Sequence, residues 1–221
     1  MCFWRHRIPK DSRRIATFVF ITVNIGLHAP FLPAAQVVNL AVNDTHGVYQ
    51  LALDVILNAR SVDVHDVITD YAHIYRIDPS IVESNIMGRP GTSVTRVRTL
   101  INDCILFLCK PILRVEDVRE VDHDEIDSVI VPRLSNVKSG VAHWQIHAMG
   151  DKTRVSYHMT LDPGFFTPPL IGPHVVAEKL KDETLICFNN IERIARIRAE
   201  QRRTRNGTLS KRTISESDRA N

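Results

Sequence analysis

The chain has 221 residues, 44% of them hydrophobic, which is long enough for one domain with a full core. Its formal net charge is +3, but residues 1–35 carry +4 and residues 196–221 carry +5, which leaves −6 on residues 36–195. A nucleic-acid-binding domain needs a basic folded surface, so this acidic body argues against that class and we expect no nucleic-acid partner.

Residues 1–35 are typical of a targeting segment. A basic stretch ending at Arg13-Arg14 precedes an apolar run of 17 residues, Ile15 to Phe31, and small residues follow at 33–35. The pattern predicts a signal peptide and therefore an exported, periplasmic or cell-envelope protein. An uncleaved N-terminal membrane anchor is the alternative, although a run of this length that contains Asn24 and His28 is marginal for ~30 Å of hydrocarbon. A mis-assigned start codon is the third reading.

Three cysteines lie outside this segment: Cys104, Cys109 and Cys187. An odd number at irregular spacing gives neither a disulfide framework nor a zinc pattern. We expect buried free thiols, with a disulfide to Cys187 as the alternative in an exported protein. No motif predicts a cofactor.

The first part of the body mixes strand and helix signals. Residues 36–47 are polar and are expected to be a spacer. The alternation in Val48–Leu57 predicts a first strand, and apolar residues at helical spacing predict a helix over 62–73. A second strand is expected at 81–87, followed by a turn at Gly88–Gly91.

From residue 92 to residue 162 the apolar residues recur mostly with a period of two. Lys110-Pro111 and three later turn signals divide this stretch into consecutive strands, which predicts an antiparallel meander. The expected strands are 93–106, 112–122, 126–134, 138–149 and 152–162.

The sheet is expected to end near Asp162, because the prolines at 168, 169 and 173 donate no backbone hydrogen bond. Pro173 suits the first turn of a helix, and residues 173–199 have the apolar spacing of an amphipathic helix about 25 residues long. Residues 198–221 are polar and basic, and we expect a disordered tail. The element order predicts an α+β domain over 48–197, in which a bent antiparallel sheet wraps around the long C-terminal helix.

Four segments carry a family resemblance: Val67-Ile-Thr-Asp-Tyr71, Arg114-Val-Glu-Asp-Val-Arg119, residues 132–140 leading to Trp144, and the hinge 162–173 with its helix. With these segments the chain resembles the START-like (SRPBCC) superfamily, in its polyketide cyclase/dehydrase and coenzyme Q-binding branch. The resemblance implies the helix-grip fold and a cavity for an apolar ligand such as a lipid, quinone or polyketide. Some members of the superfamily are cyclases or dehydratases.

Two of the predicted strands have one apolar face each. We expect these faces to point toward the helix and to supply cavity walls. Ordinary core packing is the alternative, because aromatic and sulfur-containing side chains serve either role. The residues in question are Trp144, Ile146, Tyr157 and Met159, with Phe165 and Phe166 at the cavity entrance.

A charged pair is expected on the same inner face. If Val115 points inward beside Val97 and Ile101 of the neighbouring strand, Asp117 and Arg119 also point inward. They would then pair or bind a ligand head group, because an unpaired buried charge is very costly. A salt bridge at the cavity edge without a ligand role is the alternative.

These observations lead to two hypotheses of function. The first is a non-enzymatic carrier or sensor of an apolar ligand in the cell envelope. The second is a cyclase or dehydratase in which Tyr157, Asp117 and Arg119 supply general acid/base catalysis.

Two further groups lie outside the expected cavity. His143, His147 and His158 fall on the predicted solvent face, where no partner acid at ligand spacing supports a metal site, so we expect a solvated polar surface. The basic residues beyond 196 are compatible with peripheral contact to anionic lipid head groups or with a solubilising role alone.

Overall fold

The computed structural model describes residues 35–105, 108–164 and 172–217. The predictions for residues 1–34, Phe165 and Phe166 lie outside these ranges. The described elements are β1 (Gln36–Thr45), β2 (Val48–Leu57), α1 (Ser61–Ile68), the 3-10 helix η1 (Tyr71–Arg76), β3 (Ile81–Gly91), β4 (Val94–Ile105), β5 (Leu108–Asp122), β6 (Glu125–Ile130), the 3-10 helix η2 (Pro132–Leu134), β7 (Ser139–Met149), β8 (Lys152–Asp162) and α2 (Gly172–Ser217).

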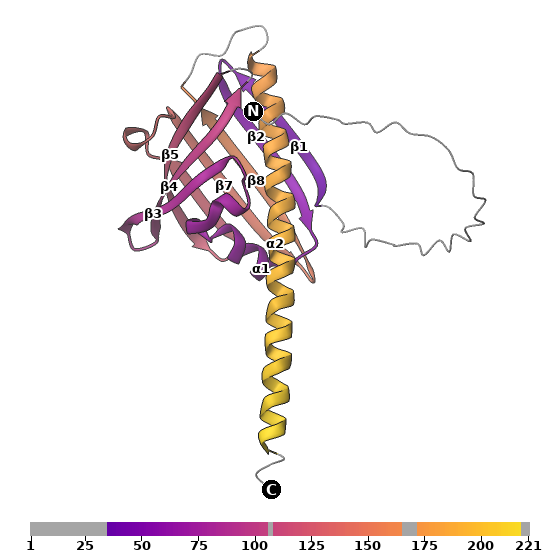
Figure 1. Ribbon diagram of the computed structural model, residues 1–221. Helices are drawn as coiled ribbons and strands as arrows, with labels where there is room; N and C mark the ends of the chain where they lie inside the picture. The colour runs from indigo at the N-terminus through magenta and orange to yellow at the C-terminus, as the bar shows by residue number, and fades with distance from the viewer. Residues whose placement is uncertain (1–34, 106–107, 165–171, 218–221) are drawn as a thin grey trace, which may run out of the picture. The chain divides into compact units, whose positions relative to one another are not determined.

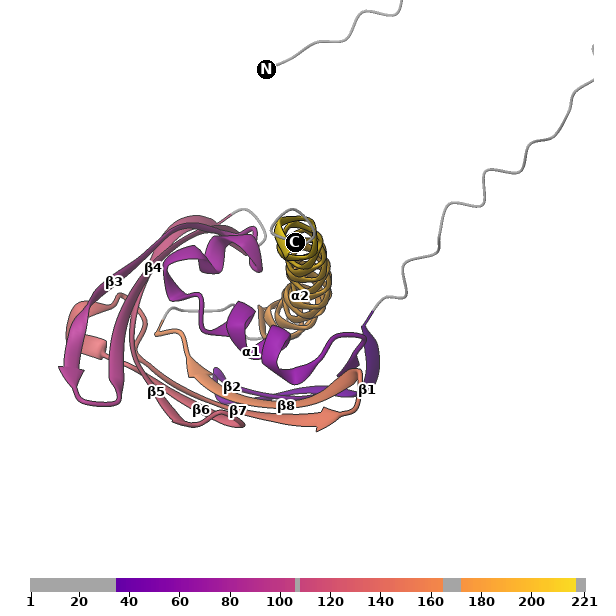
Figure 2. The same ribbon diagram turned by 90° about the horizontal axis from the view of Figure 1, so that it is seen from below.

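Eight antiparallel strands form one sheet in the order β1-β2-β8-β7-β6-β5-β4-β3. Seen from below, the sheet curves around α1, η1 and α2, which all lie on its concave side (Figure 2). This arrangement confirms the α+β class and the helix-grip fold that the resemblance implies.

Strict alternation of buried and more exposed residues shows which face of β2 points inward. Tyr49, Leu51, Leu53, Val55 and Leu57 are at most 2% exposed, whereas the residues between them are more exposed. Successive side chains of a strand point to opposite faces, so the buried set faces the helices. Strand β8 pairs with β2 and continues the same inner face.

The first part of helix α2 lies across this face, and the helix then continues past the end of the sheet (Figure 1). Phe188, Ile191 and Ala195 are at most 2% exposed and follow the spacing of a buried helical stripe. Glu192, 2% exposed on the same helix, accepts the backbone N–H of Asn58 at 2.9 Å. An apolar stripe and the hydrogen bonds from Asn58 to Glu192 therefore hold α2 beside the end of β2.

The expected spacer at 36–47 was wrong, because residues 36–45 form the edge strand β1. Its backbone pairs with β2 from Gln36 opposite Ile56 to Thr45 opposite Val48. An edge strand pairs on one side only and keeps most of its side chains exposed, so Asn39, Asn43 and Asp44 are compatible with it. Their polarity concealed the strand in the sequence.

The expected disordered tail was also wrong over most of its length, because α2 continues to Ser217. Arg198 donates to the backbone oxygen of Asp66 at 2.8 Å and to the Asp70 carboxylate, and Arg202 pairs with Asp66 at 2.9 Å. A scarcity of apolar residues argues against a packed core, but it does not prevent a helix that charged side chains hold to α1. Among the described residues, no helix combines the length and apolarity that crossing a bilayer requires.

Candidate ligand-binding cavity

A cavity of about 110 Å³ lies between the inner face of the sheet and η1. Its wall is mostly apolar, with Ile74 and Ile77 on the η1 side and Val97 on β4. The polar side chains in the wall are Arg114 and Glu116 on β5, Ser128 on β6, Tyr157 and Thr160 on β8, and Tyr71 of η1.

A second cavity of about 130 Å³ lies beneath the first turns of α2, where Val176 and Leu180 contribute to its wall. Arg114, Met159 and Leu161 line both cavities and therefore stand between them. Pockets for drug-sized ligands occupy about 300–1,000 Å³. The two cavities together are smaller than that, and a lipid-sized ligand requires them to merge.

Arg114 and Glu116 form an ion pair within the first cavity. The guanidinium Nε lies 3.1 Å from a Glu116 carboxylate oxygen, and the side chains are 26% and 16% exposed. Ser128 donates its hydroxyl to the other Glu116 oxygen at 3.4 Å. The buried Nε makes no hydrogen bond of good geometry to any described residue, so it remains available to an acceptor on a ligand.

Electrostatics keep this guanidinium charged. Burial is the largest single influence and lowers the pKa of Arg114, but Glu116 and further neighbours such as Asp78 together raise it by more, so the pKa lies above its usual value. A buried charge of this kind is tolerated only beside its counter-charge. The cavity therefore contains a charged pair with no net charge.

An aromatic cluster joins the cavity to α2. Trp144 and Tyr157 lie directly opposite each other on β7 and β8, with ring centroids 4.2 Å apart. Phe188 of α2 lies 5.4 Å from Trp144 and 5.9 Å from Tyr157. Burial raises the pKa of Tyr157, so its hydroxyl stays protonated at neutral pH.

The structure places several predicted residues at the cavities. Val97, Trp144 and Tyr157 line the first cavity, Ile101 lines the second, and Met159 lines both. Ile146 is fully buried in the core and contributes to neither wall. The ligand-binding role of these residues stays a prediction.

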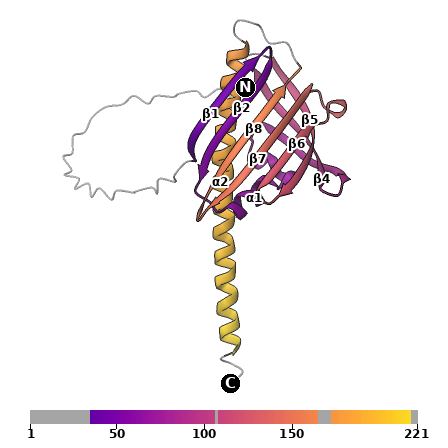
Figure 3. The same ribbon diagram turned by 180° about the vertical axis from the view of Figure 1, so that it is seen from behind.

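The predicted inward orientation of Val115, Asp117 and Arg119 was wrong. Asp117 forms a two-pronged ion pair with Arg96, both contacts at 2.7 Å, and Arg119 contacts Asp127 at 3.2 Å. These charged groups belong to the outer face of the sheet, which Figure 3 shows from behind. Val115 is buried on that same face, where its backbone bonds to Val131 and Ser135.

The length of one hairpin connection explains the error. The sequence placed a turn at Lys110-Pro111, but β5 already begins at Leu108, and Pro111 pairs with Asn102 inside the ladder. The connection is shorter than expected, and this difference changes which residues of β5 share a face with Val97. Val97 lies opposite Glu116, so Arg114 and Glu116 point inward.

The sequence pattern did not identify Arg114, Glu116 and Ser128 as cavity residues. Both faces of the 112–122 strand carry charged residues, so alternation alone did not show which set is inside. The sequence carries no signal for this register, because Ile105 pairs with Leu108 and neither Leu106 nor Phe107 between them is a typical turn residue.

Cys187 is the one cysteine whose side chain the structure describes. It forms no disulfide within the described part of the chain, and burial raises its pKa to about 12. Such a thiol is protonated at neutral pH and unreactive. The side chains of Cys104 and Cys109 lie outside the described residues.

The Arg96–Asp117 pair predicts a measurable pH dependence. The hydrogen bond from Arg96 holds the pKa of Asp117 below its ordinary value of 3.8. Because the pKa of Asp117 is lower in the folded state than in the unfolded state, its carboxylate stabilises the folded state above the ordinary pKa of 3.8. This contribution is lost as the pH falls through the folded-state pKa. In urea unfolding between about pH 5 and pH 3, Asp117→Asn should therefore lose less stability than the wild type. Asp151→Asn, in the exposed β7–β8 turn, is the matched control. Equal slopes for both variants would contradict the assignment.

The chain matches known proteins both in a family profile and in solved structures. The family profile for polyketide cyclase/dehydrase and lipid transport matches residues 50–184. A search of curated proteins finds no match.

Several solved structures are similar. They include the Zhui aromatase/cyclase from Streptomyces sp. R1128, with a TM-score of 0.55, 13% identity and coverage of 69% of this chain and 96% of that chain. A STAR-related lipid transfer protein from Xanthomonas axonopodis has a TM-score of 0.53 and 15% identity, with coverage of 70% and 98%. A START superfamily protein from Mycobacterium smegmatis has a TM-score of 0.52 and 13% identity, with coverage of 66% and 98%.

At these identities the solved structures show a shared fold. The profile match is the stronger finding, because it spans more than half of the chain and the region that contains both cavities. Together they support a role in binding a hydrophobic ligand. The chain belongs to the polyketide cyclase/dehydrase and lipid transport family.

Proposed function

We propose that this protein is a carrier for an apolar ligand whose head group bears a neutral oxygen, such as a quinone or a sterol-like lipid. The observation that carries the proposal is the Arg114–Glu116 pair, held inside a mostly apolar cavity between the sheet and η1. Burial of the apolar ligand surface supplies the affinity, at roughly 25 cal/mol per Å². The pair orients the head group, as a few polar groups do in most ligand pockets.

The charges of the pair indicate the class of head group. Glu116 already neutralises Arg114, so a phosphate or carboxylate at this place would meet a carboxylate as well as a guanidinium. A carbonyl or hydroxyl oxygen can accept from the guanidinium Nε without that repulsion. We therefore expect neutral head groups to bind better than anionic ones.

Ligand uptake requires the two cavities to become one. Met159 and Leu161 stand between them, and a methionine side chain has three rotatable bonds and adapts to irregular spaces. Val176 and Leu180 cover the second cavity from α2. Rotation of Met159 together with an outward shift of the first turns of α2 would open a continuous space.

The alternative hypothesis of a cyclase or dehydratase keeps only one of its three candidate residues, Tyr157, at the cavity. Asp117 and Arg119 lie on the face opposite the cavity, where each is already paired. Tyr157 remains at the cavity, but it stays protonated at neutral pH and cannot serve as a general base there. The carrier hypothesis needs none of these groups to transfer a proton.

A position in the cell envelope, with residues 1–35 as signal peptide or anchor, remains part of the proposal. Peripheral contact with a membrane is the second part, and the C-terminal half of α2 supports it. Arg203 and Arg205 are exposed, and α2 continues past the sheet (Figure 1). Near an anionic surface each basic residue contributes about 1 kcal/mol.

The experiment is a fluorescence titration of the full chain with two probes, decylubiquinone and palmitate. We expect decylubiquinone to quench Trp144, which lines the cavity, and to bind at least about tenfold more tightly than palmitate. Trp144→Phe should remove most of the quenching and identify its source. Tighter binding of palmitate, or quenching that survives Trp144→Phe, would contradict the proposal.

A further inference from the structure

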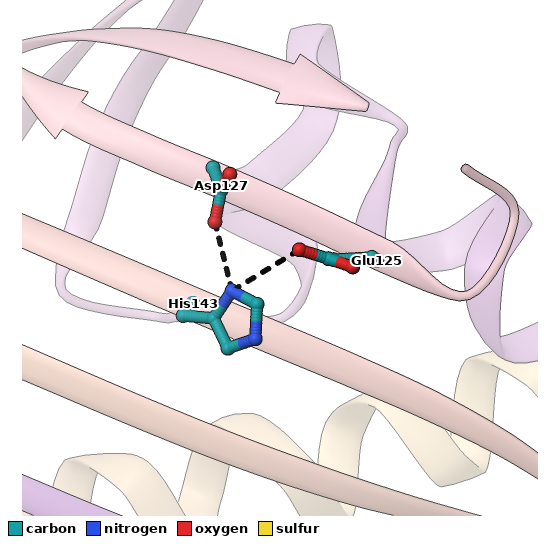
Figure 4. Close-up of side chains that lie close together, drawn as sticks. All are labelled: Glu125, Asp127 and His143. Atoms are coloured by element: carbon teal, nitrogen blue, oxygen red, sulfur yellow. Dashed lines mark hydrogen bonds and ion pairs between the residues drawn. The ribbon is translucent and has the colours of Figure 1, made fainter. Parts of the chain in front are cut away.

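A cluster of ligating side chains lies on the outer face of the sheet, away from both cavities. Glu125 and Asp127 are neighbours on the outward side of β6, and His143 projects from β7 beside them (Figure 4). The backbone register places Asp127 directly opposite His143. Two strands of the rigid sheet therefore position all three groups.

The distances within the cluster resemble those of a metal site. One oxygen each of Asp127 and Glu125 lies 2.8 Å and 3.9 Å from Nδ1 of His143, and the three ligating atoms all lie within 4.8 Å of one another. With metal–ligand bonds of about 2.0–2.1 Å, the donor atoms of a tetrahedral site are roughly 3.3 Å apart. The two distances to His143 bracket this value, so small side-chain rotations would complete the geometry.

Asp127 pairs with the cationic side chain of Arg119, whereas no cationic Lys or Arg contact is found for Glu125 among the described residues. Both carboxylates converge on a single imidazole nitrogen, which can donate to only one of them. Asp127 receives that hydrogen bond, whereas the contact recorded for Glu125 among the described residues is the longer one to His143. A divalent cation between the three groups would bind both carboxylates at once and supply the counter-charge that Glu125 lacks.

The surroundings provide support of the kind found around metal ligands. Arg119 holds the second oxygen of Asp127 at 3.2 Å, which orients this carboxylate and leaves its other oxygen toward the cluster. The side chains of Asp127 and His143 are 29% and 35% exposed, so they are partly shielded. His158, directly opposite His143 on β8, lines the same surface groove.

We propose that Glu125, Asp127 and His143 bind a divalent transition-metal ion of the Zn²⁺ class, with one nitrogen and two oxygen ligands. Zn²⁺ accepts both donor types at these distances. The site belongs to the outer face and is independent of the proposed ligand carrier. The proposal departs from the expectation of a solvated polar surface at His143, because two acidic side chains of the neighbouring strand β6 lie beside this histidine.

The test is calorimetric titration of the tag-free full chain with Zn²⁺. We expect one ion per chain, with affinity at least about tenfold weaker in His143→Gln and in Glu125→Gln. Both glutamines preserve side-chain size and polarity, and urea unfolding without metal checks that each variant folds. His147→Ala is the matched control, because this exposed histidine lies on the same strand and face but outside the cluster.

Two results would overturn the proposal. One is that the wild type binds no Zn²⁺ below about 1 mM, a level at which even weak calcium sites fill. The other is equal affinity in the wild type, His143→Gln and Glu125→Gln, which would assign the binding to other residues such as the cysteines.

Discussion

Replacement of Phe188 by alanine should lower the free energy of unfolding by about 3–5 kcal/mol, the range for removal of a buried phenylalanine. Phe188 is 2% exposed and contacts both Trp144 and Tyr157. Its loss removes apolar burial and opens a cavity between α2 and the sheet. The side chain of Phe188 therefore links α2 directly to β7 and β8.

Urea unfolding of the purified variant measures this effect. Ile186→Ala is the control on the same helix, because Ile186 is 46% exposed and its truncation should cost less than about 1 kcal/mol. Phe188→Leu should fall between the two. A loss below about 1 kcal/mol for Phe188→Ala would mean that α2 is not held to the sheet as described.

The second large effect concerns the charge pair in the cavity. Glu116→Leu should destabilise the fold by about 2–3 kcal/mol, because it leaves the Arg114 guanidinium without its counter-charge. This is less than the ~3–5 kcal/mol expected for a fully buried pair, since the two side chains keep 26% and 16% exposure. The double variant Arg114→Met/Glu116→Leu should recover most of the loss.

A double-mutant cycle in urea, with Arg114→Met as the other single variant, measures the coupling. If the double variant is stable and folded but no longer distinguishes decylubiquinone from palmitate, the pair serves recognition and not stability. If the single losses simply add, Arg114 and Glu116 do not interact in the way described. That result would also remove the basis for the expected preference for neutral over anionic head groups.

Strong alternation made the centre of the fold predictable. β2, β7 and β8 each present one apolar face, and their boundaries and inner residues followed from the sequence. β1 could not be predicted in the same way, since an edge strand needs only one paired neighbour and keeps polar residues on both faces. The helical conformation of the tail was not predicted, because the tail begins with ion pairs from Arg198 and Arg202 to Asp70 and Asp66. These partners lie far away in the sequence, so no local pattern reveals the contacts.

The functional residues were harder to predict than the fold. Trp144, Tyr157 and Met159 were found from their shared apolar faces. Arg114 and Glu116 were missed, because a polar residue in a strand reads as solvent-facing until the register of the hairpin is known. The cluster around His143 depends on pairing between β6 and β7 and leaves no pattern within either segment.

The most direct test of the carrier hypothesis is mass spectrometry of what organic solvent extracts from the natively purified full chain. We expect close to one apolar molecule per chain, with a carbonyl or hydroxyl head group, and much less from the Arg114→Met/Glu116→Leu variant purified in the same way. Equal amounts of the same molecule from both proteins, or a phospholipid as the stoichiometric ligand, would contradict the account.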